Sequence, residues 1–318
     1  MGSTIMGEPP EKPPGPLDEL DVLADIPGFG TEPELPYKLV AIDLDGTLLR
    51  ADKQITRRNA KAIRRAAELG VKVVLCSARP PRTVREIYTA LGLDTLEINY
   101  NGALVHDPVR GKHLSHLPLA GDIALRIVQM ARAMDESIDI SLEVLDKMYT
   151  DRPQSKIQTE TSKRFKPDKV GPIKSLVEQP VTKLMLLAPE QVLRPVKAAI
   201  HEHFRNDVGL MESDTTLLQY VHPRVDKGRA LRFVADYYKI PKEKVLAIGD
   251  APNDVSMLKW AGLGCCVNNG WAEAIAAADE LLPPNDQDAV AHAIETFVLH
   301  GVKPPEAPPT MLLDDFDI

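Results

Sequence analysis

Two carboxylates stand two residues apart at Asp43 and Asp45, directly after an apolar run at 39–42. Such a run is typical of a buried strand, and in an extended strand residues i and i+2 point the same way. Two like charges held that close are unfavourable unless a cation neutralises them or one carries a proton. Mg²⁺ binds one or two carboxylates and keeps several waters. The pair therefore indicates a metal-assisted reaction centre, although Asp45-Gly46 would also suit an ordinary turn.

A second acidic cluster follows another apolar run. The run at 245–248 leads into Asp250, and Asn253 and Asp254 come in the next turn. These residues would also form an ordinary turn. Because the same design stands at the end of both runs, we interpret the second cluster as part of the same metal site.

The elements that must position these residues follow a strand, helix, strand order. After the strand at 39–42, a helix is expected between Thr56 and Gly70, and a second β-branched apolar run occupies 71–76. A crossover of this kind makes neighbouring strands parallel. The sequence therefore predicts an α/β fold built on a parallel sheet.

Ser77, Ala78 and Arg79 follow the second strand, and a helix is predicted at 82–91. In an open α/β sheet, ligands bind outside the carboxyl ends of the strands. Asp43, Asp45 and Ser77 would all emerge at that edge, so we expect them to converge there.

An inserted α+β module is predicted between two breaks in the pattern, at 106–108 and 222–224. We expect it to contain helices at 120–134 and 190–204 and strands at 137–145, 181–187, 208–212 and 216–221. Beyond the module, a helix is predicted at 229–238 and strands at 245–248, 264–267 and 281–282. Residues 143–149 and 214–220 are candidates for substrate specificity, but Glu143, Asp146 and Lys147 would equally suit solvated charges at strand ends.

Lys227 precedes the helix predicted at 229–238. A lysine is usually a surface charge. Its place at the junction back to the sheet favours an inward side chain instead. A cation opposite several carboxylates would hold a doubly charged phosphate and offset the negative charge of the site.

Three other sets of residues receive structural interpretations. Asn101-Gly102 could contact a ligand near the hinge but is interpreted as a turn. The histidines at 106, 113, 116 and 222 have no metal-type spacing and are placed on the surface or at the hinge. Cys76, Cys265 and Cys266 are interpreted as reduced core thiols, which favours a cytoplasmic protein.

Taken together, these motifs resemble the four motifs of the haloacid dehalogenase superfamily. The matching segments are Asp43-Leu44-Asp45-Gly46-Thr47, Ser77, Lys227 and Gly249-Asp250 with Asn253-Asp254. Their order and spacing are most similar to the Cof-type (subfamily IIB) phosphatases, from about Tyr37 to Val298. The resemblance implies a Rossmann-like core at 37–105 and 224–300, with an inserted α+β cap of the C2B type at 106–223. A Pro-rich tail at 1–36, with a possible short helix at 17–24, and an acidic tail at 301–318 lie outside it.

The resemblance also implies catalytic roles. Asp43 would be the nucleophile that forms an aspartyl-phosphate, and Asp45 would protonate the leaving oxygen and then activate water. Mg²⁺ would be bound by Asp43, by the backbone carbonyl of Asp45 and by Asp250, with Asp254 in support.

Phosphate-binding residues are implied in the same way. Ser77 and the amide of Ala78, at a helix start, would hydrogen-bond the phosphate, and Asn253 and Lys227 would hold it from the other side. Ala78 and Ala251 stand where the family commonly has smaller or polar residues, but an alanine amide donates as well as a glycine amide.

The expected function is a Mg²⁺-dependent phosphatase that hydrolyses a small phosphorylated metabolite, such as a sugar phosphate, a nucleotide or a cofactor phosphate. Asp45 favours phosphoryl chemistry, because family members that cleave carbon-halogen bonds generally lack this second acid. Two alternatives stay open: a sugar phosphomutase of the same superfamily, and a non-catalytic binding or scaffold protein on the same fold.

Composition bounds the remaining possibilities. The chain has 318 residues, of which 44% are hydrophobic, and a net charge of -8. That charge disfavours a nucleic-acid partner, and the basic cluster at 57–65 has the spacing of a solvated helix face. No apolar run is long enough to span a bilayer, and the first residues are too polar for a secretory signal. We therefore expect a small phosphate ester as the partner, and leave the oligomeric state open.

Overall fold

The computed structural model describes residues 35–153 and 157–302. The short helix predicted at 17–24 lies outside these ranges, as do almost all of the two predicted tails.

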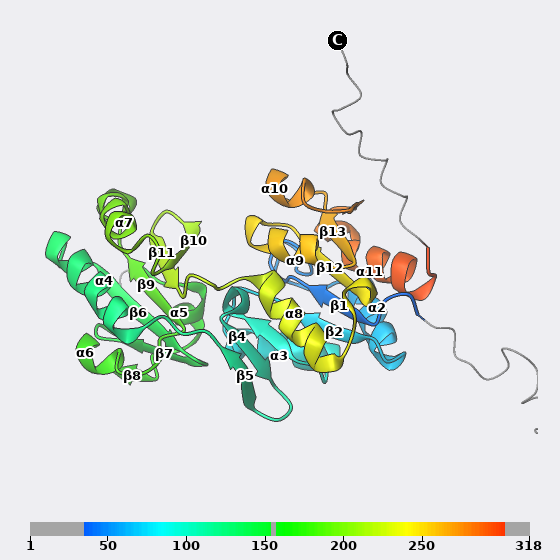
Figure 1. Cartoon of the computed structure of the whole chain (residues 1–318), viewed down its shortest axis with the longest axis horizontal. Coiled ribbons are helices and arrows are strands. Elements are labelled where there is room, and N and C mark those ends of the chain that lie inside the picture. The colour runs from blue at the N-terminus through cyan, green and yellow to red at the C-terminus, as the bar shows by residue number, and fades with distance from the viewer. Residues whose placement is uncertain (1–34, 154–156, 303–318) are drawn as a thin grey trace, which may run out of the picture. The chain divides into compact units, whose positions relative to one another are not determined.

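The described residues contain a five-stranded parallel sheet in the order β14-β13-β12-β1-β2 (Figure 1). Its strands are β1 Leu39–Ile42, β2 Lys72–Leu75, β12 Val245–Gly249, β13 Leu263–Val267 and β14 Glu280–Leu282. Every residue of β1 and β12 is buried. This explains their continuous apolar sequences, since a parallel strand is covered on both faces. The predicted parallel sheet is confirmed, and the three cysteines are free and buried as expected.

Helices connect these strands. They are α2 Arg57–Glu68, α3 Pro81–Leu91, α8 Lys227–Tyr238, α9 Val255–Trp260, α10 Ala272–Ile275 and α11 Ala289–Ala293. The hydroxyl of Thr56 accepts a hydrogen bond from the Asn59 amide, which is the expected cap at the start of α2. Helix α2 buries Ala62, Ile63 and Ala66 while its basic residues are exposed, so the predicted solvated basic face is confirmed.

A small antiparallel sheet follows the second crossover, in the order β3-β4-β5. Its strands are β3 Glu97–Asn99, β4 Leu104–Asp107 and β5 Lys112–His116, and the short 3-10 helix η1 Tyr100–Gly102 joins the first two. The hairpin of β4 and β5 was not predicted from the sequence. A surface position for His106 is wrong, because the residue is 9% exposed and its Nδ1 lies 3.2 Å from the Lys112 carbonyl oxygen.

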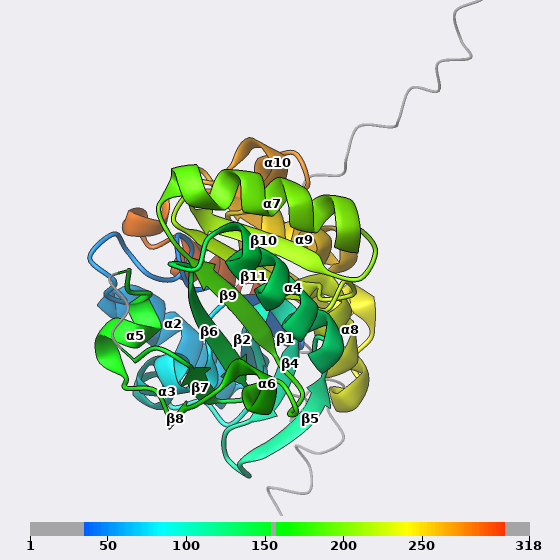
Figure 2. The same ribbon diagram turned by 90° about the vertical axis from the view of Figure 1, so that its left-hand side faces the viewer.

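The inserted segment forms a sheet of six described strands in the order β10-β11-β9-β6-β7-β8. Its strands are β6 Asp139–Val144, β7 Lys147–Thr150, β8 Lys169–Val170, β9 Lys183–Leu187, β10 Gly209–Asp214 and β11 Leu217–Val221, and its helices are α4 Gly121–Met134, α5 Glu160–Arg164, α6 Ile173–Leu176 and α7 Glu190–Phe204. Figure 2 shows α4 and α7 lying across this sheet, and their apolar residues share one buried cluster with it. The two long helices predicted here are confirmed.

The buried apolar side chains form separate clusters in the two sheets. One cluster includes Leu39, Val105 and Ala230, with the partly buried Leu114 against it, and the other begins at Leu119. The predicted limits of core and cap, after residues 105 and 223, stay a prediction. None of the helices that the structure describes combines the length and the apolar character needed to cross a membrane.

Glu97 is a buried carboxyl group with few partners. It is 1% exposed, Asn99 Nδ2 lies 3.4 Å from its Oε2, and its Oε1 has no hydrogen-bond partner among the described residues. Burial raises the pKa of Glu97 to about 7, against the opposing effect of Asn99. The folded chain therefore binds more protons than the unfolded chain between the ordinary glutamate pKa and about pH 7. Stability falls as the pH rises through that window.

Glu97→Gln should remove this fall, because the amide cannot ionise. We expect the variant to gain stability relative to the wild type between pH 5 and pH 8, by up to about 3 kcal/mol. Urea unfolding at several pH values measures it, with the exposed Glu273→Gln as the control. Any cost of burying the glutamine amide is independent of pH. The test is therefore the slope of the unfolding free energy against pH. Equal slopes in the two variants would contradict the prediction.

Candidate active site

Three carboxylates from distant segments meet in one buried cluster. Asp43, Asp250 and Asp254 each offer an oxygen, and these atoms lie within 4.8 Å of one another. Asp43 follows β1 and Asp250 follows β12, which are adjacent strands with Ile42 opposite Ile248. Asp254 ends the 3-10 turn η3 Pro252–Asp254. The structure thus brings together the two acidic segments that the sequence marked.

Lys227 lies between two of these carboxylates. Its Nζ donates to Asp43 Oδ1 and to Asp254 Oδ1, each at 2.6 Å, and its side chain is fully buried. Helix α8 begins at Lys227, two residues earlier than predicted, because Asp226 caps it. Burial by itself would lower the pKa of Lys227, but Asp254 and Asp43 outweigh it and raise that pKa. The lysine is therefore held as a cation.

Asp254 and Thr47 fix the position of Asp250. Asp254 Oδ2 accepts hydrogen bonds from the backbone N–H groups of Asp250 and Ala251, both at 3.0 Å. Thr47 Oγ1 donates to Asp250 Oδ1 at 2.7 Å. No role was predicted for Thr47, although its place after the Asp-Gly turn was a usable signal. Both oxygens of Asp254 are engaged inside the protein, so it supports the loop that carries Asp250.

Gly46 permits the close approach of these segments. It has a φ of +92°, and a Cβ added there would lie 2.3 Å from Asp250 Oδ2. Any side chain would therefore both strain the backbone and displace the carboxylate. Position 46 must be glycine for the cluster to close.

The crowding of carboxylates changes their proton affinity. Burial raises the pKa of Asp43 well above its usual value, Lys227 opposes this, and the charges of Asp254 and Asp250 add to it. Burial also raises the pKa of Asp250 to about 6, despite the hydrogen bond from Thr47. A divalent cation would relieve this repulsion, and a set of oxygen donors suits a hard ion such as Mg²⁺. The residues present therefore fit the expected metal.

The Asp45 carboxylate has different partners from Asp43. Arg79 donates to it through Nε and Nη2, both at 2.6 Å, and Lys53 Nζ donates at 2.8 Å. Strand β1 ends at Ile42 and the chain then turns. The strand alternation that predicted a shared direction with Asp43 does not reach Asp45, so that expectation is corrected.

These contacts set the ionisation of Asp45. Its side chain is 41% exposed. Partial burial raises its pKa, but the hydrogen bonds from Arg79 and Lys53 outweigh burial, and the pKa of Asp45 is lowered. The position of Arg79 in the sequence indicated no function, although Arg79 holds the second acid together with Lys53.

Ser77 and Ala78 follow β2 at the same sheet edge. Ser77 is buried, its Oγ accepts from the Arg79 amide at 3.2 Å, and Ala78 is exposed. Ala78 was expected at a helix start, which is wrong because α3 begins at Pro81 with Pro80 as its N-cap. A residue before a proline is disfavoured from helical geometry, so the chain bends at 78–79 before the helix begins.

Asn253 and Asn101 contact each other beside the cluster. Asn253 is exposed, and its Nδ2 donates to Asn101 Oδ1 at 2.9 Å. Asn101 is only 6% exposed. Its interpretation as a simple turn missed this contact. Asparagine tolerates positive φ before a glycine, so the residue pair signalled the turn but not the partner.

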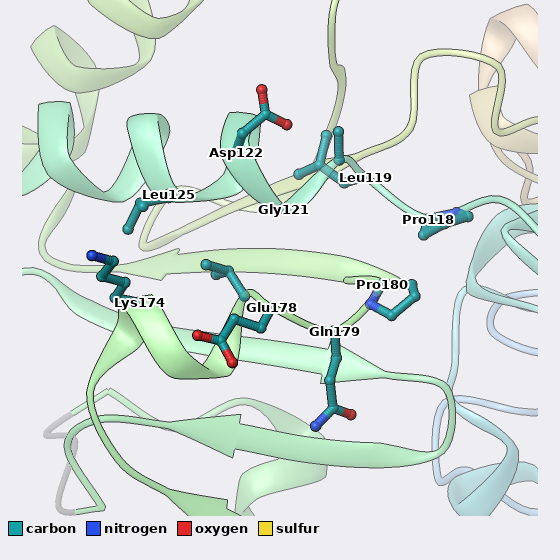
Figure 3. A pocket seen from close by; sticks show the side chains of 11 residues that line it. Pro118, Leu119, Gly121, Asp122, Leu125, Lys174, Glu178, Gln179 and Pro180 are labelled. Atoms are coloured by element: carbon teal, nitrogen blue, oxygen red, sulfur yellow. The ribbon is translucent and has the colours of Figure 1, made fainter.

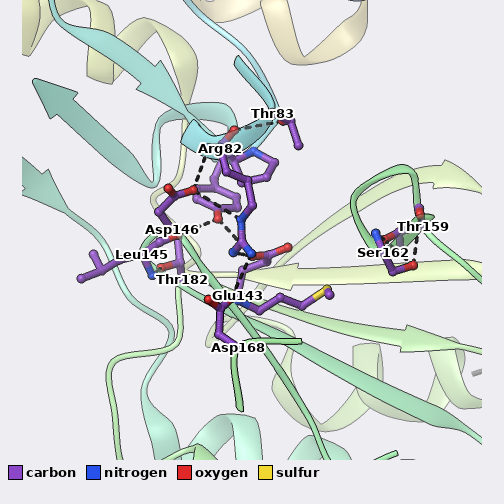
Figure 4. Close-up of polar contacts among 12 residues, drawn as sticks. Arg82, Thr83, Glu143, Leu145, Asp146, Thr159, Ser162, Asp168 and Thr182 are labelled. Carbon is purple, nitrogen blue, oxygen red and sulfur yellow. Dashed lines mark hydrogen bonds and ion pairs between the residues drawn. The ribbon is translucent and has the colours of Figure 1, made fainter. Parts of the chain in front are cut away.

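Arg82 links α3 to the turn between β6 and β7 (Figure 4). Its guanidinium contacts Glu143 Oε2 at 3.1 Å and Asp168 Oδ2 at 3.0 Å, and its backbone N–H donates to Asp146 Oδ1 at 2.7 Å. Because Pro80 has no side-chain cap to offer, Asp146 caps α3 from the inserted segment. Glu143 is 1% exposed, so its interpretation as a solvated charge is wrong.

A hollow of about 570 Å³ lies within the inserted segment (Figure 3). It is bounded by the start of α4, including Gly121 and Leu125, and by the connection from α6 to β9, including Lys174 and Pro180. None of the residues that line it belongs to the acidic cluster. This hollow is therefore separate from the candidate active site.

A family model described as haloacid dehalogenase-like hydrolase matches residues 40–294. The chain belongs to this family. The family's chemistry agrees with the acidic cluster at the carboxyl ends of β1 and β12. Curated relatives of this chain are named phosphatases, so the protein is a hydrolase of phosphate monoesters, with a Rossmann-like core and an inserted cap.

Relatives and solved structures support the same placement. The 5-amino-6-(5-phospho-D-ribitylamino)uracil phosphatase YitU of Bacillus subtilis (strain 168) is 28% identical, over 82% of this chain and 97% of its own length. Phosphatase YwpJ of the same organism is 28% identical, over 81% of this chain and 99% of its own. The crystal structure of a haloacid dehalogenase-like hydrolase from Bacteroides thetaiotaomicron has a TM-score of 0.75 at 26% identity, covering 81% of this chain and 98% of that one.

Proposed function

We propose that this protein is a Mg²⁺-dependent phosphatase that hydrolyses a small phosphorylated metabolite through an aspartyl-phosphate. The observation that carries the proposal is the buried cluster of Asp43, Asp250 and Asp254, with Lys227 bonded to two of its members. Buried charges of this density destabilise a fold unless they are compensated, and groups with perturbed pKa values cluster at functional sites. A divalent cation beside Lys227 would compensate them.

In the first step, an oxygen of the Asp43 carboxylate attacks phosphorus, the bond from phosphorus to the ester oxygen breaks, and Asp45 gives its proton to the leaving oxygen. In the second step, Asp45 takes a proton from water, whose oxygen attacks phosphorus, so that phosphate leaves and the Asp43 carboxylate is restored. Splitting the displacement in two lowers the highest barrier. Acid-base assistance by a positioned carboxyl adds about 10² to 10⁴ in rate.

The contacts of the two acids suit these roles. Lys227 opposes the effect of burial on Asp43 and so favours the ionised form, which is the form that attacks. Arg79 and Lys53 favour the ionised form of Asp45, which is the form that takes a proton from water. Proton donation in the first step requires these two contacts to weaken when the substrate binds.

Asp43, Asp250 and the backbone carbonyl of Asp45 would hold Mg²⁺, with Asp254 in support. When bound, the ion neutralises charge on the phosphoryl oxygens. Thr47 and Asp254 keep Asp250 in place for this task.

Ser77, the amide of Ala78, Asn253 and Lys227 are proposed to hold the phosphate. Ser77 and Asn253 emerge at the carboxyl edge of the same sheet as Asp43. Lys227 already donates to Asp43 and Asp254, so it would hold a bound phosphate by its positive charge and by its third N–H donor.

A metabolite-wide phosphate-release assay tests the proposal, with 5-amino-6-(5-phospho-D-ribitylamino)uracil in the panel because a relative is named for it. We expect release from at least one ester, loss of that activity after EDTA treatment, and recovery with Mg²⁺. Circular dichroism of the EDTA-treated protein controls for unfolding. Undiminished turnover without metal, or release from none of the esters, would overturn the proposal. Isomerisation of a sugar 1-phosphate without free phosphate would favour a phosphomutase instead.

A further inference from the structure

The short segment Tyr100–Gly102 holds three consecutive residues at positive φ, with values of 50°, 56° and 97°. Glycine accepts this conformation and asparagine tolerates it, but it strains a tyrosine. Strained backbone persists only where the surroundings hold it in place, and such positions concentrate at functional sites. The contacts of this segment therefore show what the strain achieves.

The backbone of the segment is fixed to two parts of the candidate active site. The amides of Tyr100 and Asn101 donate to the carbonyls of Arg79 and Ser77, at 3.3 Å and 2.9 Å. On the other side, a Cβ added at Gly102 would lie 2.4 Å from the carbonyl oxygen of Asp226, the N-cap of the helix that carries Lys227. The segment is thus held between the Ser77 strand end and the start of α8.

The Asn101 side chain contacts a third part of the site. Its Oδ1 accepts from Asn253 Nδ2 at 2.9 Å, and its own Nδ2 lies 2.9 Å from Met211 Sδ in β10. Both ends of the amide have partners, since its oxygen accepts from Asn253 and its NH₂ group donates to the Met211 sulfur. Asn101 is buried and Asn253 is exposed, so the contact ties an exposed amide to a buried one and restrains the Asn253 side chain.

We propose that Asn101 is a positioning residue for phosphate binding: it fixes the side-chain orientation of Asn253 and so prepares that amide for the phosphoryl group. The proposal rests on the proposed function, in which Asn253 holds the phosphate. The strain at 100–102 is the means by which a buried amide reaches Asn253 from the end of β3. Without the contact, the exposed Asn253 side chain would sample several rotamers, and binding phosphate would cost the entropy of ordering it.

Asn101→Gly removes the side chain and keeps the backbone conformation, because glycine takes the same positive φ without strain. The variant therefore tests the contribution of the side chain alone. We expect it to weaken binding of inorganic phosphate to the Mg²⁺-loaded protein by about tenfold, the size of one lost hydrogen bond. KM for an active ester should rise similarly, with a smaller change in kcat. Asn101→Asp keeps the oxygen that accepts from Asn253. This variant should therefore bind phosphate more tightly than Asn101→Gly, despite the added negative charge.

A double-mutant cycle decides whether Asn101 acts through Asn253. If it does, the double variant Asn101→Gly with Asn253→Ala should bind phosphate no more weakly than Asn253→Ala alone. Additive losses in the cycle, or unchanged phosphate binding in Asn101→Gly, would overturn the inference while leaving the phosphatase assignment intact. Failure of the assignment itself is distinguishable, since the wild type would then release phosphate from no ester. Thermal unfolding of each variant shows that the losses occur in folded protein.

Discussion

Asp43→Asn is expected to abolish phosphate release, lowering kcat by at least about four orders of magnitude, as for other removed nucleophiles. An amide oxygen is too weak a nucleophile to displace the ester oxygen from phosphorus. The fold should persist, because the amide can still accept the hydrogen bond from Lys227 and no longer repels Asp250 and Asp254. Turnover of an ester found active in the panel, measured beside thermal unfolding, tests both halves of this expectation.

The exposed Asp94→Asn provides the matched control, since it makes the same chemical change away from the cluster. It should retain wild-type turnover and stability. Appreciable activity in Asp43→Asn, measured on protein whose mass excludes reversion to aspartate, would show that another group attacks phosphorus. Loss of the folded state in Asp43→Asn would instead assign the residue a mainly structural role.

Lys227→Met is expected to have the largest effect on stability. The methionine fills a similar volume but leaves the carboxylates of Asp43 and Asp254 buried without their cation. Removing one partner of a buried ion pair typically costs about 3 to 5 kcal/mol of folding free energy. Turnover should also be lost, because the charge of Lys227 no longer favours the ionised form of Asp43. Urea unfolding in EDTA, which keeps metal from substituting for the lysine charge, measures the stability change.

Two further variants make this measurement decisive. Lys61→Met alters an exposed lysine on α2 and should change stability little. The double variant Lys227→Met with Asp254→Asn removes one of the stranded charges, so it should recover part of the lost stability without recovering turnover. If Lys227→Met were as stable as the wild type, the two hydrogen bonds of Lys227 would not be what compensates the buried carboxylates.

Local pattern was enough to predict the central sheet and the strand ends that carry Asp43 and Asp250. The apolar runs are short and continuous because parallel strands are buried on both faces. The crossover helix α2, with its cap at Thr56, makes its neighbouring strands parallel. Local pattern predicted less well where a strand depends on its partners, as in the β4–β5 hairpin around His106.

Partners distant in the chain account for what the sequence reasoning missed in the site. Thr47 is 203 residues from Asp250, and Asn253 is 152 residues from Asn101. A residue's type suggests that it needs a partner, but its spacing along the chain does not identify which one. The same holds for Arg79 and Asp45, which lie on separate strand ends and meet only because β1 and β2 are neighbours.

The sequence by itself determined at which sheet edge the acidic residues would emerge, because apolar periodicity and parallel crossovers are local properties of the chain. Their roles in phosphoryl chemistry are implied by the family resemblance and stay a proposal. Only the tertiary structure decided how these residues are paired: Asp45 with Arg79, Asp254 with its own loop, and Asn101 with Asn253. This pairing depends on where turns such as the one at Gly46 direct each side chain, and on which partners lie within hydrogen-bond distance of it in the folded chain.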